Sequence, residues 1–251
     1  MSDPAPEARS QTPGCGRRVA FFGGSFDPPH LGHLAVARAA RAALGLDTVL
    51  FAPVGAQPLK PHGSTAGFDD RLAMTRLAIA GEPGFSVSLA DAPQPSGAPN
   101  YTLETLLALR AELLPGSALF CLMGADSFFA LRLWHRAAEI PFAAPLIVAS
   151  RPGQRLDDLK AALPEGLTME SLAETGRQDS GVELRSYLLL NRAGESTPFY
   201  LLPGLHLEIS ATETRERIRA LVRAPSETPT AGHKLLPSAV LDYIRSRGLY
   251  R

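Results

Sequence analysis

Short apolar runs alternate with helical patterns along the first 150 residues, and this alternation constrains the fold more than any other feature. The runs have the length and bounding turns of buried strands, and they cover 18–22, 48–54, 86–90, 118–124 and 145–150. Patterns typical of helices lie between them, at 31–44, 69–80 and 102–114. Strands that alternate with helices predict a parallel sheet with right-handed crossovers. We therefore expect an α/β fold with a doubly wound, Rossmann-like parallel sheet and with ligands at the carboxyl ends of its strands.

The rest of the chain carries weaker patterns. Residues 154–198 predict only a helix followed by a loop. The elements expected after them are strands at 199–202 and 205–210, a helix over 210–222, a connection at 223–234 and a C-terminal helix from Pro237 to Gly248. The first 16 residues predict a disordered tail. We expect one domain over 17–251, with a small C-terminal helical part.

Composition excludes several classes of function. Lys and Arg together number 25, as do Asp and Glu, so no global field draws the chain to nucleic acid or to an anionic membrane. No stretch approaches the roughly 20 apolar residues that span a bilayer. The two cysteines, Cys15 and Cys121, lack the short spacing of a metal or redox site, and Cys121 is expected to be a buried thiol. These features predict a cytoplasmic protein whose anion sites are built locally.

The string GGSFDPPHLGH, at 23–33, lies where the first expected strand hands over to the first helix. Gly23 and Gly24 let a ligand approach the backbone closely, and the free N–H groups of a helix's first turn favour an anion. His30 and His33 are three positions apart on a helix, so both can face the same phosphate. An isolated pair of this kind more often caps a helix or is buried in the core. A zinc site is not indicated, because no acidic or thiol third ligand lies at a useful spacing. The surrounding string instead favours a polyphosphate site.

This string resembles the signature of the nucleotidyltransferase superfamily that carries HxGH after its first strand. The superfamily's second signature, ISxTxxR, resembles ISATETR at 209–215. Ser210 and Thr212 by themselves could be helix caps, and Arg215 could be a solvated helix residue. Two matches in the right order favour phosphate binding, for which Arg215 can supply two donors.

Within this superfamily, the chain from 19 to 251 most resembles the bacterial nicotinate-nucleotide adenylyltransferase family. The further matches are APVGAQPLK at 52–60, YTLETL at 101–106, GADS at 124–127, LWHR at 133–136, SRPG at 150–153 and the C-terminal LLPSAVLDYIRSRGLYR. One departure is Pro58-Leu59-Lys60, where relatives usually place Pro-His before the basic residue. No role of a histidine in that loop is carried over to this chain.

The resemblance implies that ATP and nicotinic acid mononucleotide give nicotinic acid adenine dinucleotide and pyrophosphate by direct in-line attack, with Mg²⁺ carried by the ATP phosphates. It implies that His30, His33 and Arg215 are catalytic. The residues implied for ATP binding are Gly23, Gly24, Ser25, Phe26, His30, His33, Gly124, Asp126, Ser210, Thr212 and Arg215. Those implied for the nicotinate nucleotide are Lys60, Tyr101, Thr102, Trp134 and Arg151. The other histidines, at 62, 135, 206 and 233, are taken as structural, and no metal site of the protein's own is expected.

Three alternatives remain. A pantetheine-phosphate adenylyltransferase shares both signatures, but its relatives are shorter and lack the matches around Tyr101 and Trp134. A cytidylyltransferase would need a different base pocket, and a non-catalytic nucleotide sensor would not need groups that stabilise a leaving pyrophosphate. For Trp134, the only tryptophan, plain core packing is the alternative to stacking on the pyridine. The sequence leaves open the oligomeric state and how strictly acid is preferred over amide.

Overall fold

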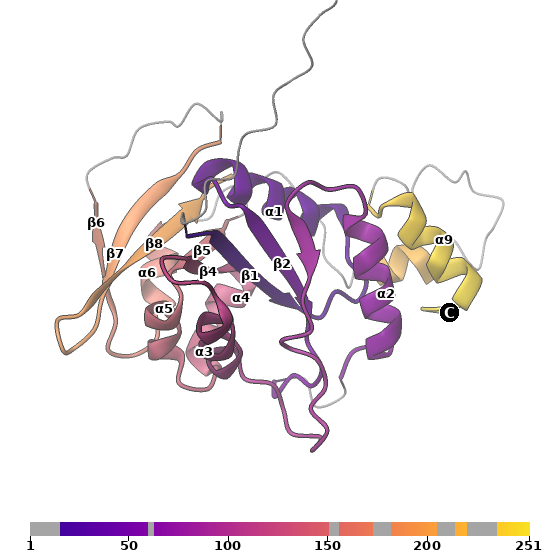
Figure 1. Ribbon diagram of the computed structural model, residues 1–251, viewed down its shortest axis with the longest axis horizontal. Coiled ribbons are helices and arrows are strands. Elements are labelled where there is room, and N and C mark those ends of the chain that lie inside the picture. Colours follow the sequence, from indigo (N-terminus) through magenta and orange to yellow (C-terminus); the bar gives the residue numbers. More distant parts are fainter. Residues whose placement is uncertain (1–15, 60–62, 151–155, 173–181, 205–213, 220–234) are drawn as a thin grey trace, which may run out of the picture.

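The computed structural model describes residues 16–59, 63–150, 156–172, 182–204, 214–219 and 235–251. A single sheet crosses this part of the molecule, with its strands in the order β3-β2-β1-β4-β5-β8-β7-β6 (Figure 1). The strands are β1 (Arg18–Gly24), β2 (Thr48–Pro53), β3 (Phe85–Val87), β4 (Ala118–Gly124), β5 (Leu146–Ala149), β6 (Thr168–Ser171), β7 (Arg185–Leu190) and β8 (Ser196–Leu202). From β3 to β8 in this order, neighbouring strands run parallel, which confirms the predicted α/β class.

Helices cover both faces of the sheet, as a doubly wound fold requires. Successive residues of β1 point to opposite faces: Phe21 packs into the core beneath α3 (Thr102–Glu112), and Phe22 packs into the core beneath α1 (Leu31–Leu44). Figure 1 shows α1 on one side of the sheet and α3 on the other. The helix α1 has the predicted bounds. The prediction for α2 (Phe68–Ile79) was off by one residue at each end, and α3 ends two residues early.

The prediction for residues 154–198 was wrong after its first helix. The helix α6 (Leu156–Ala161) is present, but β6 and β7 follow it and pair antiparallel, and β7 pairs antiparallel with β8. The strand β6 is short and mostly exposed, so its sequence TMES carries no strand pattern. Its pairing with β7 supplies what local propensity lacks. The expected strand at 86–90 also ends early, at Val87.

The chain after β4 forms short helices that the sequence did not predict. They are α4 (Ala125–Ala130), η1 (Leu131–Leu133), η2 (Ala137–Glu139) and α5 (Ile140–Ala143). Each has six residues or fewer, too few for a helical period to stand out. Trp134 and His135 lie between η1 and η2.

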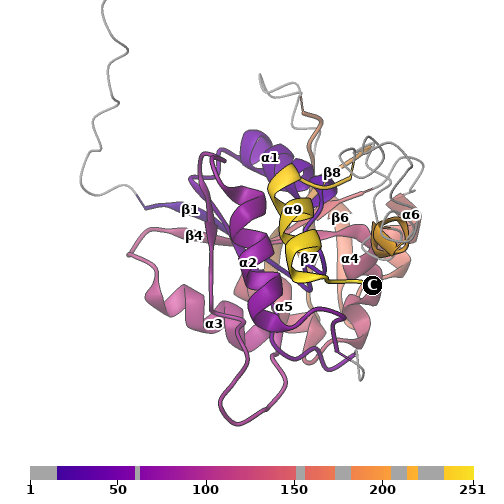
Figure 2. The same cartoon turned by 90° about the vertical axis from the view of Figure 1, so that its right-hand side faces the viewer.

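A third, smaller core joins the C-terminal part to α2. The helix α9 (Ser238–Arg247) lies beside α2, as Figure 2 shows, and ends at Gly248, whose φ of 61° is left-handed as a helix stop requires. This core contains Met74 of α2, Ile218 of the helical segment 214–219, residues of α9, and Leu235 and Tyr250, which flank α9. The expected tail up to residue 15, the strand at 205–210, the proposed cap at Ser210 and the connection at 223–234 lie outside the described residues.

Candidate nucleotide-binding site

A cavity of about 790 Å³ opens at the carboxyl ends of β1, β4 and β5. The ends of these strands, Gly24, Gly124 and Ala149, all line it. The chain leaves β1 toward β2 on one side and returns to β4 on the other, so β1 and β4 flank the point where strand order reverses. Ligands of doubly wound sheets bind at this point, and the cavity lies where the sequence predicted it.

The signature histidines lie at the start of α1. His30 is the residue just before the helix, and its backbone N–H donates to Nδ1 of His33 at 3.1 Å. The two rings stack with their centroids 3.6 Å apart, and both residues line the cavity. Because Nδ1 of His33 accepts a hydrogen bond, its neutral ring carries the proton on Nε2. His33 is therefore built to donate from Nε2.

Burial sets the charge of both rings. It lowers the pKa of His30 from 6.5 to about 4, and it lowers the pKa of His33 well below 6.5, with a further contribution from the neighbouring His30. Both imidazoles are thus neutral at pH 7. Within the described part of the chain, the buried Nδ1 of His30 has no hydrogen-bond partner.

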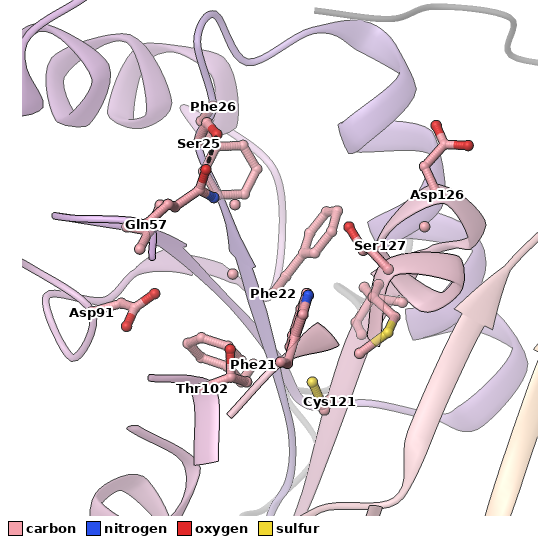
Figure 3. A pocket seen from close by; sticks show the side chains of 18 of the residues that line it. Phe21, Phe22, Ser25, Phe26, Gln57, Asp91, Thr102, Cys121, Asp126 and Ser127 are labelled. Atoms are coloured by element: carbon pink, nitrogen blue, oxygen red, sulfur yellow. Dashed lines mark hydrogen bonds between the residues drawn. The ribbon is translucent and has the colours of Figure 1, made fainter. Parts of the chain in front are cut away.

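The turn before the histidines approaches the cavity with its backbone. Gly23, Gly24, Ser25 and Phe26 all line it. A Cβ at Gly23 would come within 2.7 Å of the Phe21 ring, so this position has no room for a side chain. Phe26 is buried and has a φ of 45°, and the Ser25 hydroxyl donates to the Gln57 side chain at 3.3 Å (Figure 3).

The two signature segments meet at Asp27. Nη1 of Arg215 donates to the Asp27 carbonyl at 2.7 Å and lies 3.9 Å from its carboxylate. This hydrogen bond joins two residues that are 188 positions apart in the sequence, and Asp27 lies three positions before His30. Arg215 is not among the residues that line the cavity. Its described contacts join it to Asp27 of the signature turn.

The remaining predicted residues divide into two groups. Gly124, Asp126, Tyr101, Thr102 and Trp134 line the cavity, and Figure 3 shows Asp126 and Thr102 on different sides of it. Trp134 is half-buried and also packs against the large core, so both interpretations of its role fit. Lys60, Arg151, Ser210 and Thr212 lie outside the described residues.

Sequence reasoning missed several polar residues of the cavity. His135 was taken as structural, yet it lines the cavity with its ring 4.5 Å from that of Tyr101. Asn100 is buried, accepts the Ala56 N–H at 3.0 Å and donates to the Ala92 carbonyl at 2.9 Å. The position of His135 beside Trp134 was a usable signal. Asn100 carried none, because it ends a loop without periodicity.

Asp91 is a third missed residue, and it is the most perturbed carboxyl of the cavity. It is 5% exposed, and its side chain accepts a hydrogen bond from the Thr105 hydroxyl at 2.9 Å. Burial raises the pKa of Asp91 from 3.8 to about 6, against the opposing effect of that bond. Cys121 lies at the base of the cavity as the expected buried thiol, and burial raises its pKa to about 12.

Fold and cavity together define a nucleotide-binding α/β protein: a glycine turn and a helix start face a cavity at the switch point of the sheet. A family model described as cytidylyltransferase-like matches residues 21–217. A protein of Gloeobacter violaceus, named "Probable nicotinate-nucleotide adenylyltransferase", is 39% identical over 235 residues, which cover 94% of this chain and 97% of that protein. A protein of Trichlorobacter lovleyi with the same name is 36% identical over 234 residues, which cover 93% of this chain and 99% of that protein. The chain belongs to this nicotinate-nucleotide adenylyltransferase family.

A solved structure supports the fold independently of sequence. The nicotinic acid mononucleotide adenylyltransferase of Plasmodium falciparum, complexed with NaAD, superposes with a TM-score of 0.63. The alignment covers 93% of this chain and 97% of that one at 16% identity. The architecture is thus shared with a protein whose sequence is very different. In the described part of the chain, no helix is both long and apolar enough to cross a membrane.

Proposed function

We propose that the protein transfers the adenylyl group of ATP to nicotinic acid mononucleotide, and so makes nicotinic acid adenine dinucleotide and pyrophosphate. The observation that carries this proposal is that one cavity gathers the signature turn at 23–33 and residues of the family-matching segments at 101–106, 124–127 and 133–136. The fold, the site and the relatives all support the same reaction.

The chemistry that this cavity must promote needs no general base. A phosphate monoester has a second pKa near 6, so the acceptor phosphate is already anionic at neutral pH. One of its oxygens bonds to the α-phosphorus of ATP, and the bond from that phosphorus to the bridging oxygen of the β-phosphate breaks. The electron pair leaves on pyrophosphate. The site has to align the two phosphates and stabilise the charge on the departing group.

The neutral histidines suit this task as donors. His33 presents Nε2–H because Nδ1 is occupied by the His30 backbone. Donors of this kind cost no reorganisation when charge develops on pyrophosphate. Arg215 supports them through Asp27, and direct contact with phosphate, together with roles for Ser210 and Thr212, stays a prediction. We assign residues 23–26, Gly124 and Asp126 to the binding of ATP.

The acceptor is assigned to the other side of the cavity. Trp134 would stack on the pyridine, with Tyr101 and Thr102 beside it, since all three line the cavity. Lys60 and Arg151 stay predicted phosphate contacts. Magnesium would enter as Mg-ATP, because Mg²⁺ is commonly bound through substrate phosphates. We place the reaction in the cytoplasm, in keeping with the free thiol of Cys121.

An acceptor panel tests the proposal. Purified protein with Mg-ATP should release pyrophosphate rapidly with nicotinic acid mononucleotide and slowly with the amide mononucleotide. CTP in place of ATP serves as a control for the nucleotide, because the family model is described by cytidylyl transfer. Pyrophosphate release only with phosphopantetheine as acceptor, or only with CTP as donor, would overturn the proposal. So would ATP binding without pyrophosphate release for any acceptor of the panel. The last result would indicate a nucleotide sensor.

A further inference from the structure

Tyr250, just beyond α9, reaches the signature turn from the far end of the sequence. Its side chain is 5% exposed, and its hydroxyl donates to Oδ1 of Asp27 at 2.7 Å. Asp27 precedes His30 by three positions, with two prolines between them. The ring of each proline fixes its φ angle, so a shift of Asp27 also shifts His30.

Asp27 is a hub that several elements hold at once. Its carboxylate is buried and accepts the backbone N–H groups of Thr65 at 2.6 Å and Ala66 at 3.1 Å. Arg215 holds the carbonyl of the same residue at 2.7 Å. None of these partners belongs to the signature turn itself. The turn is therefore positioned from outside, by the β2–α2 connection and by the C-terminal core.

A second contact ties the C-terminal segment to the same helix start. The Leu31 N–H, at the first position of α1, donates to the Leu235 carbonyl at 2.8 Å. The first N–H groups of a helix have no partner within the helix, so this contact satisfies one of them from the C-terminal side. Leu235 and Tyr250 belong to the core that packs α9 on α2, seen side by side in Figure 2. Residues 235–251 thus contact the turn on both sides of His30.

We propose that Tyr250 is a positioning residue for adenylyl transfer: by holding the Asp27 carboxylate, it fixes the turn that aims His30 and His33 into the cavity. This inference rests on the proposed function. Tyr250 acts through Asp27, because it is not among the residues that line the cavity. Misplacement of reacting groups by about 1 Å can cost on the order of 100-fold in rate, so a small shift of the turn has a measurable effect.

The variant Tyr250→Phe tests this with little disturbance. It keeps the buried ring and removes only the hydroxyl, and Oδ1 of Asp27 retains the Ala66 N–H. We expect kcat to fall about tenfold, with the KM of the acceptor unchanged, because the shift affects alignment at the transferred phosphorus.

Tyr243→Phe is the matched control. Tyr243 lies in α9, and its hydroxyl donates to the Asp70 carboxylate in α2 at 2.9 Å, so the same type of bond is removed from the same core. Asp70 does not line the cavity and does not contact the signature turn among the described hydrogen bonds. We expect kcat of this variant to stay within about twofold of the parent. Equal losses in the two variants, or an unchanged Tyr250→Phe enzyme, would overturn the positioning role.

A measurement without substrate separates this proposal from the proposed function. The imidazole C–H resonances of His30 and His33, followed by NMR across pH, report their surroundings whether or not the protein turns over. They should shift in Tyr250→Phe and stay in place in Tyr243→Phe. If the parent protein is inactive with the acceptor panel, the proposed function fails, and this comparison still decides the positioning role. Resonances that move in neither variant would refute it.

Discussion

Two walls of the cavity are built in opposite ways. The turn wall, residues 23–33, is one continuous stretch that runs from β1 into α1. The loop wall comprises 54–59, 91–102 and 130–135, three segments that are far apart in the sequence. The turn wall is held by its own helix and by distant partners at Asp27. The loop wall is held by contacts among its own segments and by single hydrogen bonds from neighbouring elements, such as Arg71 of α2, whose Nη2 donates to the Val54 carbonyl at 2.8 Å.

The three segments of the loop wall contact one another closely. The Gly55 N–H donates to the Asp91 carbonyl at 2.7 Å, and a Cβ at Gly55 would come within 2.5 Å of Pro93, so these loops approach closely. Asn100 adds two hydrogen bonds, and Tyr101 meets His135 by ring contact. When one such contact is lost, the loop that it held can shift. The turn wall stays attached to α1 when one of its contacts is lost. The difference predicts distinct responses to mutation in catalysis, stability and acceptor binding.

The largest expected effect is on the turn wall. His33→Ala removes the Nε2–H donor and should lower kcat about 100- to 1000-fold, the range for loss of one donor to transition-state charge. Thermal melting followed by circular dichroism should show a folded protein. His135→Ala, on the loop wall, is the control: its ring is exposed and packs at a tilt against Tyr101, so its loss should leave kcat within about threefold. Comparable losses in both variants would erase the functional contrast between the walls.

Buried titratable groups on the two walls should respond to pH with opposite sign. The pKa of Asp91 is raised to about 6 in the folded protein, so its effect favours folding at low pH and is lost as pH rises from about 4 through 6. The pKa of His30 is lowered to about 4, so its contribution is present above pH 6.5 and is lost as pH falls toward 4.

Asp91→Asn isolates the loop-wall half of this effect. The variant should gain up to about 3 kcal/mol in free energy of unfolding at pH 8, and the gain should vanish at pH 4, where the parent carboxyl is protonated. Urea denaturation of both proteins between pH 4 and pH 8 measures it. A gain that does not grow with pH would contradict the burial of an ionisable carboxyl at this site.

Loosening the loop wall should cost less. Asn100→Ala leaves the Ala56 N–H and the Ala92 carbonyl without their partner, and it should lower the free energy of unfolding by about 1–3 kcal/mol. The KM of the acceptor should rise as well, because the loops shift. Asn191→Ala is the control: Asn191 accepts two backbone N–H groups in an exposed turn, where water can replace it. An equal loss at Asn191 would show that Asn100 has no special place.

The smallest effect is expected at Trp134. Trp134→Ala should raise the KM of the acceptor about tenfold and leave the KM of Mg-ATP unchanged, since one stacked aromatic is worth about 1 kcal/mol or somewhat more. Steady-state kinetics with each substrate varied in turn measure this, and Trp134→Phe should recover most of the loss. If stability falls while both KM values stay constant, Trp134 is a core residue and the stacking assignment is wrong.

The turn wall was accessible from the sequence because its chemistry is local. A strand end, two glycines and two histidines at helical spacing predict a phosphate-binding helix start, and the resemblance of the surrounding string to the HxGH signature favours it over a capping or core role. The loop wall was only partly accessible. Tyr101, Thr102 and Trp134 were found by resemblance, whereas Asp91 and Asn100 lie in a loop whose sequence has no period to interpret. Their burial and partners exist only after the loops pack.

The alternation of apolar runs and helical patterns determined the α/β class and the carboxyl-end location of the cavity, since hydrophobic periodicity is a property of neighbouring residues. Tertiary structure alone decided the antiparallel β6 and β7, the raised pKa of Asp91 and the meeting of Arg215 and Tyr250 at Asp27. Strand pairing, desolvation and hydrogen bonds across some 190 to 220 residues depend on distances in space, which a linear pattern does not contain.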